Sequence, residues 1–149
     1  MNQITTQYIT ENGACYEQYV ITDPAAKTSL TIPPERGGMI TGFTLNGDEY
    51  IWTRRPNFSE CNRPRFGVPV LFPSCGNPDG GVHLFDGKAY PMECHGLADL
   101  CAWEVDSVGP DGVTLVLEST PLTKFLYPFD FTLLVNYNLE GNQATISMT

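Results

Sequence analysis

Short segments rich in β-branched and aromatic residues recur along the chain, and glycine, proline or asparagine separates them. This arrangement is typical of strands joined by tight turns. We expect strands in seven segments: 28–34, 39–45, 49–53, 101–108, 112–119, 129–139 and 143–149. The pattern predicts a mostly β chain.

Two pairs of these segments predict hairpins. Within 101–119, the sequence Gly-Pro-Asp-Gly separates two arms in which apolar and polar residues nearly alternate, as in half-buried strands around a turn. Segments 129–139 and 143–149 flank a second such turn. Further turns are expected at Asn46-Gly47-Asp48, Asp79-Gly80-Gly81 and Asp86-Gly87. Because apolar residues do not recur at helical spacing, we expect at most a helical turn, near Phe58 or Leu122.

Residues 52–95 differ from this pattern. Nine prolines or glycines lie between Pro64 and Gly87, and few stretches alternate. We expect a long ordered loop system here. Loops held by a rigid β scaffold carry many binding and catalytic groups, so functional residues are expected first in this segment.

Length and composition indicate a single β domain over residues 1–149. With 42% hydrophobic residues, such a domain buries a core that needs neither disulfides nor a structural metal. The net charge of −9 argues against nucleic-acid binding, because the phosphates carry the same sign. Apolar runs are too short to cross a bilayer, and the first residues do not resemble a signal peptide. We therefore expect no membrane partner and a cytoplasmic location.

The five cysteines indicate reduced thiols rather than a disulfide framework, since their number is odd and no Cys-x-x-Cys pair occurs. The alternative is a metal site formed by Cys94, His95 and Cys101. Neighbouring residues on a strand point to opposite faces, so Cys94 and His95 would not both bind a metal from one strand. We expect no metal.

Residues 65–77, RFGVPVLFPSCGN, combine an arginine, an apolar strand flanked by prolines, and a turn; residues 90–99, YPMECHGLAD, follow. These segments resemble the aldose 1-epimerase family, also called galactose mutarotase-like. Its members carry R-x-G-[IV]-P-[IV]-x-F-P-x-x-G and then H-G-[FL]-A. Three further segments match in the family's order: IPPERGG (32–38), DGKAYPM (86–92) and YPFDF (127–131).

The resemblance implies part of a β-supersandwich of antiparallel strands, in a family whose fold is about twice as long as this chain. The chain resembles the N-terminal portion of that fold and stops within an expected strand. We therefore expect an open sheet edge, which a partner chain or self-association would cover.

The activity implied by the resemblance is interconversion of the α and β anomers of a free hexose. A carboxylate base removes the proton of the anomeric hydroxyl, and an imidazolium acid protonates the ring oxygen so that the ring opens. The resemblance implies no cofactor. In the family the glutamate base and one histidine lie in the C-terminal half, so neither is assigned in this chain.

Two residues match sugar-contacting positions of the family. Arg65 corresponds to the arginine that hydrogen-bonds sugar hydroxyls. His95 corresponds to the histidine that contacts the substrate near the reacting oxygens, which makes it the catalytic candidate. Without the resemblance, His95 would be a loop histidine satisfied by the backbone and Arg65 a solvated member of an arginine cluster. The other histidine, His83, is expected to face solvent in a turn.

Asp99 departs from the family pattern. Many relatives, including those acting on hexose 6-phosphates, have arginine here, whereas a carboxylate repels a phosphate. We therefore expect a neutral aldose rather than a sugar phosphate, and we include Asp99 among the substrate-binding residues. The alternative is that Asp99 faces water.

Other interpretations follow from the same residues. Trp52, Trp103, Phe72 and Tyr127 could form a platform for a sugar ring, but most of them are interpreted as core. The alternative function is a non-catalytic carbohydrate-binding module, or a half-enzyme that needs a partner. The third interpretation is a β domain that binds no ligand.

Overall fold

The computed structural model describes residues 1–11, 13–52 and 66–149. Over these residues the chain forms eleven strands, with short 3₁₀ turns in place of longer helices. The strands are β1 (Gln3–Glu11), β2 (Ala14–Asp23), β3 (Thr28–Ile32), β4 (Gly42–Leu45), β5 (Asp48–Glu49), β6 (Val82–Phe85), β7 (Lys88–Pro91), β8 (Glu104–Val108), β9 (Gly112–Glu118), β10 (Thr132–Glu140) and β11 (Gln143–Met148), and the 3₁₀ turns are η1 (Pro34–Arg36), η2 (Asp79–Gly81), η3 (Ala98–Leu100) and η4 (Thr123–Phe125). The predicted all-β class is confirmed.

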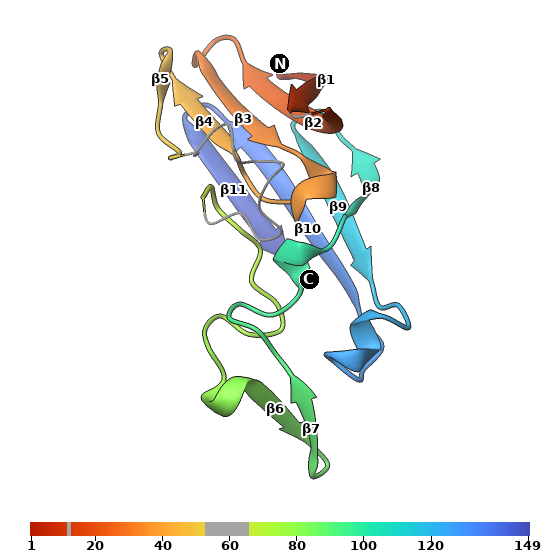
Figure 1. The fold of residues 1–149 in the computed structure, drawn as a ribbon. Helices are drawn as coiled ribbons and strands as arrows, with labels where there is room; N and C mark the ends of the chain where they lie inside the picture. The colour runs from red at the N-terminus through yellow and green to blue at the C-terminus, as the bar shows by residue number, and fades with distance from the viewer. Residues whose placement is uncertain (12, 53–65) are drawn as a thin grey trace.

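Two antiparallel sheets lie face to face as a sandwich (Figure 1). One has the strand order β1-β2-β3-β4-β5 and the other β11-β10-β9-β8, while β6 and β7 form a separate hairpin. The hairpin extends from one end of the sandwich, at the bottom of Figure 1. The sandwich is thus the scaffold, and its irregular connections gather at the end that carries this hairpin.

Alternating burial defines the inner faces of the sandwich. On β10, Leu133, Val135, Tyr137 and Leu139 are buried while the residues between them are more exposed, as the two-residue period of a strand requires. The same core contains Ile21, Leu30 and Ile32 from the facing sheet and Val113, Leu115 and Leu117 from β9. Removing this apolar surface from water, at about 25 cal/mol per Å², is the main stabilising contribution to the fold.

The two predicted hairpins are confirmed. β8 pairs with β9 and β10 pairs with β11, both antiparallel. The Gly109 N–H donates to the Gly112 carbonyl at 2.9 Å and closes the first turn. The β8–β9 pairing shifts register between Val105 and Ser107, an irregularity that the near-alternation of the sequence does not reveal.

The strand predicted over residues 49–53 is largely wrong, because β5 ends at Glu49. The Glu49 carboxylate accepts hydrogen bonds from the N–H groups of Phe43 and Ile51, each at 2.8 Å. A side chain thus takes the place of a backbone partner and ends the pairing. Tyr50 and Trp52 follow as exposed residues, so Trp52 is not among the aromatic residues of the core.

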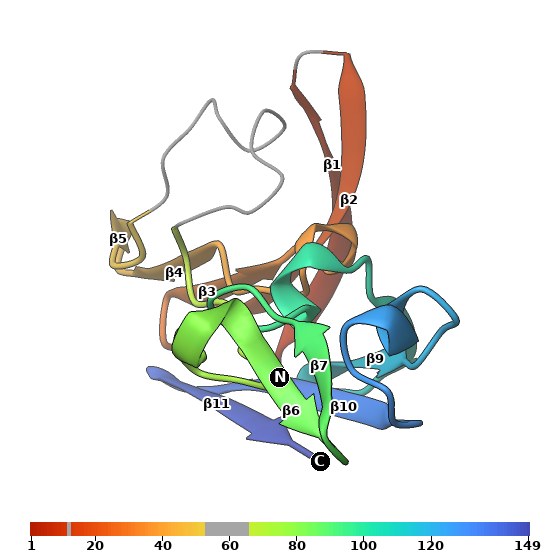
Figure 2. The same ribbon diagram turned by 60° about the horizontal axis from the view of Figure 1, so that its bottom comes forward.

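Two hairpins were not predicted. β1 and β2 pair in continuous register from Gln3 to Glu11, although this polar, threonine-rich segment has no clear apolar alternation. Part of this hairpin projects beyond the sandwich (Figure 2). β6 and β7 lie inside the expected loop system, joined at the predicted Asp86-Gly87 turn. Both hairpins are paired along their length, but only β1–β2 reaches the core, through Ile4 and Ile21.

Smaller expectations have mixed outcomes. The helical turn near Leu122 is confirmed as η4, and Phe58 lies outside the described residues. The strand expected between the prolines of 68–73 is wrong, since only isolated bridges form there, from Val68 to Ile40 and from Phe72 to Gly96. Proline cannot donate to a strand ladder, so residues 69 and 73 interrupt the pairing.

Candidate functional site

Residues 68–76, here called the Phe72 strap, hold residues 92–98, here called the His95 loop. The Phe72 carbonyl accepts the N–H groups of Leu97 at 2.8 Å and Ala98 at 3.2 Å, and the Gly76 carbonyl accepts the N–H of His95 at 3.1 Å. These contacts join the two segments that carry the family-like motifs. They replace the regular ladder that the prolines of the strap prevent.

The His95 loop has an uncommon backbone. His95 has φ 72° and Gly96 has φ 84°, so two consecutive residues are left-handed. A non-glycine residue in such a conformation costs about 1–3 kcal/mol and persists where surrounding contacts enforce it. At Gly96 a Cβ atom would lie 2.1 Å from the Phe72 carbonyl oxygen, so the approach of the strap requires glycine there.

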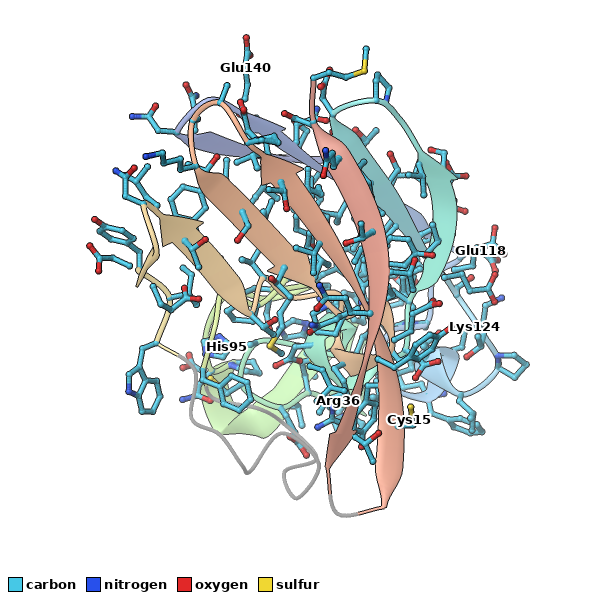
Figure 3. The ribbon with its side chains drawn as sticks, turned by 90° about the horizontal axis from the view of Figure 1, so that it is seen from above. Cys15, Arg36, His95, Glu118, Lys124 and Glu140 are labelled. Carbon is cyan, nitrogen blue, oxygen red and sulfur yellow. The ribbon has the colours of Figure 1, made fainter. Side chains whose placement is uncertain are left out.

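The His95 side chain is half-buried. Its Nδ1 atom is buried and has no hydrogen-bond partner among the described residues. An imidazole nitrogen left in this state is costly, and the ring's tautomer is not fixed by a described group on that side. His95 lies well away from Lys124 and Glu140 in Figure 3, at the end of the sandwich with the irregular connections.

The YPFDF segment supports the strap from another direction. The rings of Tyr127 and Phe131 lie 5.5 and 4.9 Å from the ring of Phe72, centroid to centroid. Tyr127 also meets Phe85 of β6 edge to face at 5.8 Å. The strap, β6 and the YPFDF segment therefore meet at Tyr127, and both Phe72 and Tyr127 pack partly buried against the core as expected.

Asp99 lies on η3, directly after the His95 loop, and is 4% exposed. The alternative that Asp99 faces water is therefore wrong. Its backbone is packed so closely that a Cβ atom on Gly37 would lie 2.5 Å from the Asp99 carbonyl oxygen. Burial, and secondarily the Asp99 carboxylate, raise the pKa of the Cys101 thiol, which keeps that thiol protonated near neutral pH.

The IPPERGG segment packs against η3. The Gly37 N–H donates to the Cys101 carbonyl at 3.2 Å, and the Trp103 indole N–H donates to the Ala98 carbonyl at 2.9 Å. Trp103 is 3% exposed and belongs to the core, as expected. Arg36 lies over the Tyr16 ring, 5.2 Å from its centroid. Sequence analysis gave Arg36 no role, and its only signal was its place in this motif.

The other candidate residues are placed as follows. Arg65 lies outside the described residues. His83 is half-buried on β6 and meets the Phe85 ring edge to face at 5.8 Å, so the expectation that it faces solvent in a turn is wrong. The turn predicted at Asp79-Gly80-Gly81 ends just before this strand, and the pairing of His83 with Tyr90 on β7 keeps His83 in the hairpin.

A cavity of about 490 Å³ lies beside the His95 loop. It is lined by Cys94 and Gly96, on either side of His95, and by Asn77, Glu93, Leu100 and Leu126 among others. A second cavity of about 500 Å³ lies between β7 and residues 119–125. Because the second is lined by Lys124, far from His95 in Figure 3, it is a separate feature.

The described residues contain neither a cluster suited to a metal ion nor a helix suited to span a membrane. Over the described part of the chain, His, Cys, Asp and Glu side chains nowhere gather in threes that could hold a metal ion. None of the helical segments in the same residues has the length and apolar character to span a bilayer.

Comparison with known proteins gives a consistent result. Residues 17–149 match the model of the family described as aldose 1-epimerase. Among curated proteins, none matches the chain.

Several solved structures are similar. The Slr1438 protein of Synechocystis sp. PCC 6803 is 30% identical with a TM-score of 0.84, over 88% of this chain and 47% of that one. A galactose mutarotase related enzyme from Lactobacillus acidophilus is 25% identical with a TM-score of 0.69, over 94% and 41% of the two chains. A galactose mutarotase-like protein from Clostridium acetobutylicum shares the fold at 18% identity, with a TM-score of 0.80 over 98% and 48%. The chain spans about half the length of each of these structures.

Proposed function

Because the chain belongs to the aldose 1-epimerase family, we propose that it binds a free hexose at the His95 loop and serves in the interconversion of the sugar's α and β anomers. The observation that carries the proposal is the half-buried imidazole of His95, which is held by a strained backbone and has an Nδ1 atom without a partner in the described part of the chain. Retained strain of this kind is concentrated at functional sites.

His95 is proposed as the catalytic residue of this chain. An imidazole can donate a hydrogen bond from one nitrogen and accept one at the other, and histidine is the side chain best suited to acid–base transfer near physiological pH. With Nδ1 buried, the Nε2 edge is the part of the ring that would meet a sugar oxygen. The Gly76 and Phe72 carbonyls would fix the ring's position during proton transfer.

A neutral aldose is the proposed substrate. Asp99 is nearly buried directly after the loop, and a carboxylate in a poorly hydrated place acts strongly on nearby charges. It would therefore oppose a phosphate group at this site. Asp99 is proposed to contribute to substrate binding through this field, and Arg65 is proposed to hydrogen-bond the sugar hydroxyls as its family counterpart does.

The family's glutamate base and second histidine belong to the half that this chain does not match. We propose that residues 1–149 form the N-terminal portion of a mutarotase-like domain and that further polypeptide adds to the edge of β11. On that strand, Ile146 and Met148 are 45% and 56% exposed, while Ala144, on the same face, packs against the core. An added layer would cover these side chains.

The second candidate function is a carbohydrate-binding module without catalysis. The same observations at His95 support this function if no further polypeptide supplies the glutamate base and the second histidine. Both functions require sugar binding at the His95 loop, and they differ in the rate of anomer interconversion.

The test uses the chain and two variants, His95→Ala and its matched control His83→Ala. Ligand-observed NMR with glucose and galactose should show sugar contact in the unsubstituted chain and in the His83 variant, and contact should be lost in the His95 variant. Polarimetry on the same samples then separates a catalyst from a binding module. Sugar contact that survives in the His95 variant would contradict both functions.

A further inference from the structure

The two sandwich sheets end in four edge strands, β1, β5, β8 and β11, and these edges are not equally protected. Natural proteins guard a sheet edge by keeping it short, placing charges on it or breaking its register. β5 has two residues, both acidic. β8 contains Glu104 and Asp106 and shifts register between Val105 and Ser107. Two of the four edges are therefore guarded.

β1 lacks these protections except for one charged residue, Glu11, at its last position. It is nine residues long and pairs with β2 in unbroken register. From Gln3 to Thr10 it contains no charged residue and no proline. All side chains in that stretch are exposed except those of Ile4 and Ile9, which are half-buried. In the described chain β1 pairs with β2 alone, and Figure 2 shows its hairpin projecting from the sandwich.

We propose that the free edge of β1 pairs, antiparallel, with β1 of a second copy of this chain. Each chain carries a net charge of −9, so two copies repel over most of their surfaces. The uncharged stretch from Gln3 to Thr10 avoids this repulsion and offers backbone N–H and carbonyl groups. A two-fold axis at Thr6 brings Ile4 of each copy opposite Tyr8 of the other, and aromatic residues paired with β-branched ones are favourable across strands.

The side chains of β1 explain why a second copy, rather than a covering layer, suits this edge. Gln3, Thr5, Thr6 and Gln7 are exposed and polar. Apart from Ile4, which already packs against the core, the strand therefore needs no cover over its faces while its edge is paired. β11 differs, because the exposed Ile146 and Met148 require a cover over the sheet face as well. A β1 pair is thus an isologous contact between folded chains, and it does not depend on the proposed sugar function.

The test is the mass of the chain in solution, measured by sedimentation velocity from low to high micromolar concentration. The unsubstituted chain should shift from 16.5 kDa toward twice that mass as its concentration rises. Thr6→Lys places two ammonium groups opposite each other at the two-fold axis, and we expect it to weaken the association by roughly threefold to tenfold. Circular dichroism confirms that this exposed substitution leaves the fold intact.

Two control variants carry the same charge on other edges. Ser107→Lys on β8 should leave the association unchanged, and Thr145→Lys on β11 should do the same. If the chain is a monomer at every concentration, the proposal is overturned. It is also overturned if Thr145→Lys dissociates the dimer and Thr6→Lys does not, because the second copy would then pair at β11.

Discussion

The sandwich and the His95 loop are stabilised in different ways. In the sandwich, the central strands β3 and β10 bury every second side chain, and residues such as Leu115 and Leu139 are fully buried between the sheets. The His95 loop also contributes Leu97 and Ala98 to that core, but its path depends on backbone contacts as well. The Phe72 and Gly76 carbonyls of the strap hold the loop through backbone hydrogen bonds, and Gly96 permits their close approach.

The two regions therefore have different roles: the sandwich is the scaffold, and the loop carries the proposed site. Apolar burial stabilises the sandwich, which can tolerate variation on its outer faces. The contacts around the loop hold the His95 backbone in a left-handed conformation. They leave one ring nitrogen of His95 without a hydrogen-bond partner among the described residues. Four substitutions test the contrast, from the largest expected effect to the smallest.

The largest effect is expected in the sandwich core. Leu115→Ala removes a side chain that is 0% exposed and should lower the free energy of unfolding by about 2–5 kcal/mol, through lost burial and the cavity left behind. Urea denaturation measures it. The control is Leu84→Ala, since Leu84 is 69% exposed and should change stability by less than about 0.5 kcal/mol. Equal losses of unfolding free energy in the two variants would contradict the role of burial in stabilising the core.

In the loop, the corresponding substitution is Gly96→Ala. Its Cβ atom would collide with the Phe72 carbonyl, so we expect a loss of about 3 kcal/mol together with loss of sugar contact. Gly87→Ala is the matched control, because Gly87 is also left-handed at φ 76° but has open space around its Cβ position. It should cost about 1 kcal/mol. If the Gly96 variant behaves like the Gly87 variant, the strap does not hold the loop.

A smaller effect is expected where the sandwich contacts the IPPERGG segment. The Tyr137 hydroxyl on β10 donates to the Gly38 carbonyl next to η1, and burial raises its pKa well above the usual value. Tyr137→Phe leaves that buried carbonyl without its partner and should cost about 1–2 kcal/mol. Tyr50→Phe, at a residue 62% exposed, is the control and should be neutral in the same urea titration.

The smallest effect concerns the turns at the far end of the sandwich. The Asp23 carboxylate accepts the N–H groups of Ala26, Ala25 and Gly141, and these bonds, Ala26 first, lower its pKa below the usual 3.8. A lowered pKa means that the carboxylate stabilises the fold above pH 3.8 and that this contribution is lost as pH falls through the folded-state pKa. The difference in unfolding midpoint between the chain and Asp23→Asn should therefore shrink on acidification. A difference that stays constant with pH would contradict this role.

The sandwich could be predicted from the sequence because its strands alternate or are bounded by glycine turns. β9, β10 and their hairpin partners follow that rule. β1 could not, since most of its residues are polar and exposed, and its pairing with β2 gives no clear apolar alternation in the sequence. The end of β5 could not, because the Glu49 side chain replaces a backbone acceptor. Contacts of this kind depend on three-dimensional proximity and leave no periodic pattern.

The candidate site was predictable in part, and for a different reason. His95 stood out because its segment resembles a family motif. Neither the left-handed backbone of His95 nor the convergence of Tyr127 and Phe131 on Phe72 follows from local propensity. The burial of Asp99 on η3 was not predictable either, because an aspartate after a loop is as common at the surface.

The most direct test of the central claim observes the two histidine rings of the chain by NMR while glucose or galactose is added. Only His83 and His95 contribute ring signals, and His83→Ala assigns them. If the His95 loop binds the sugar, the His95 ring resonances shift in proportion to sugar added while those of His83 stay in place. If the His95 resonances do not move at saturating sugar, or if only those of His83 move, the His95 loop is not the sugar site.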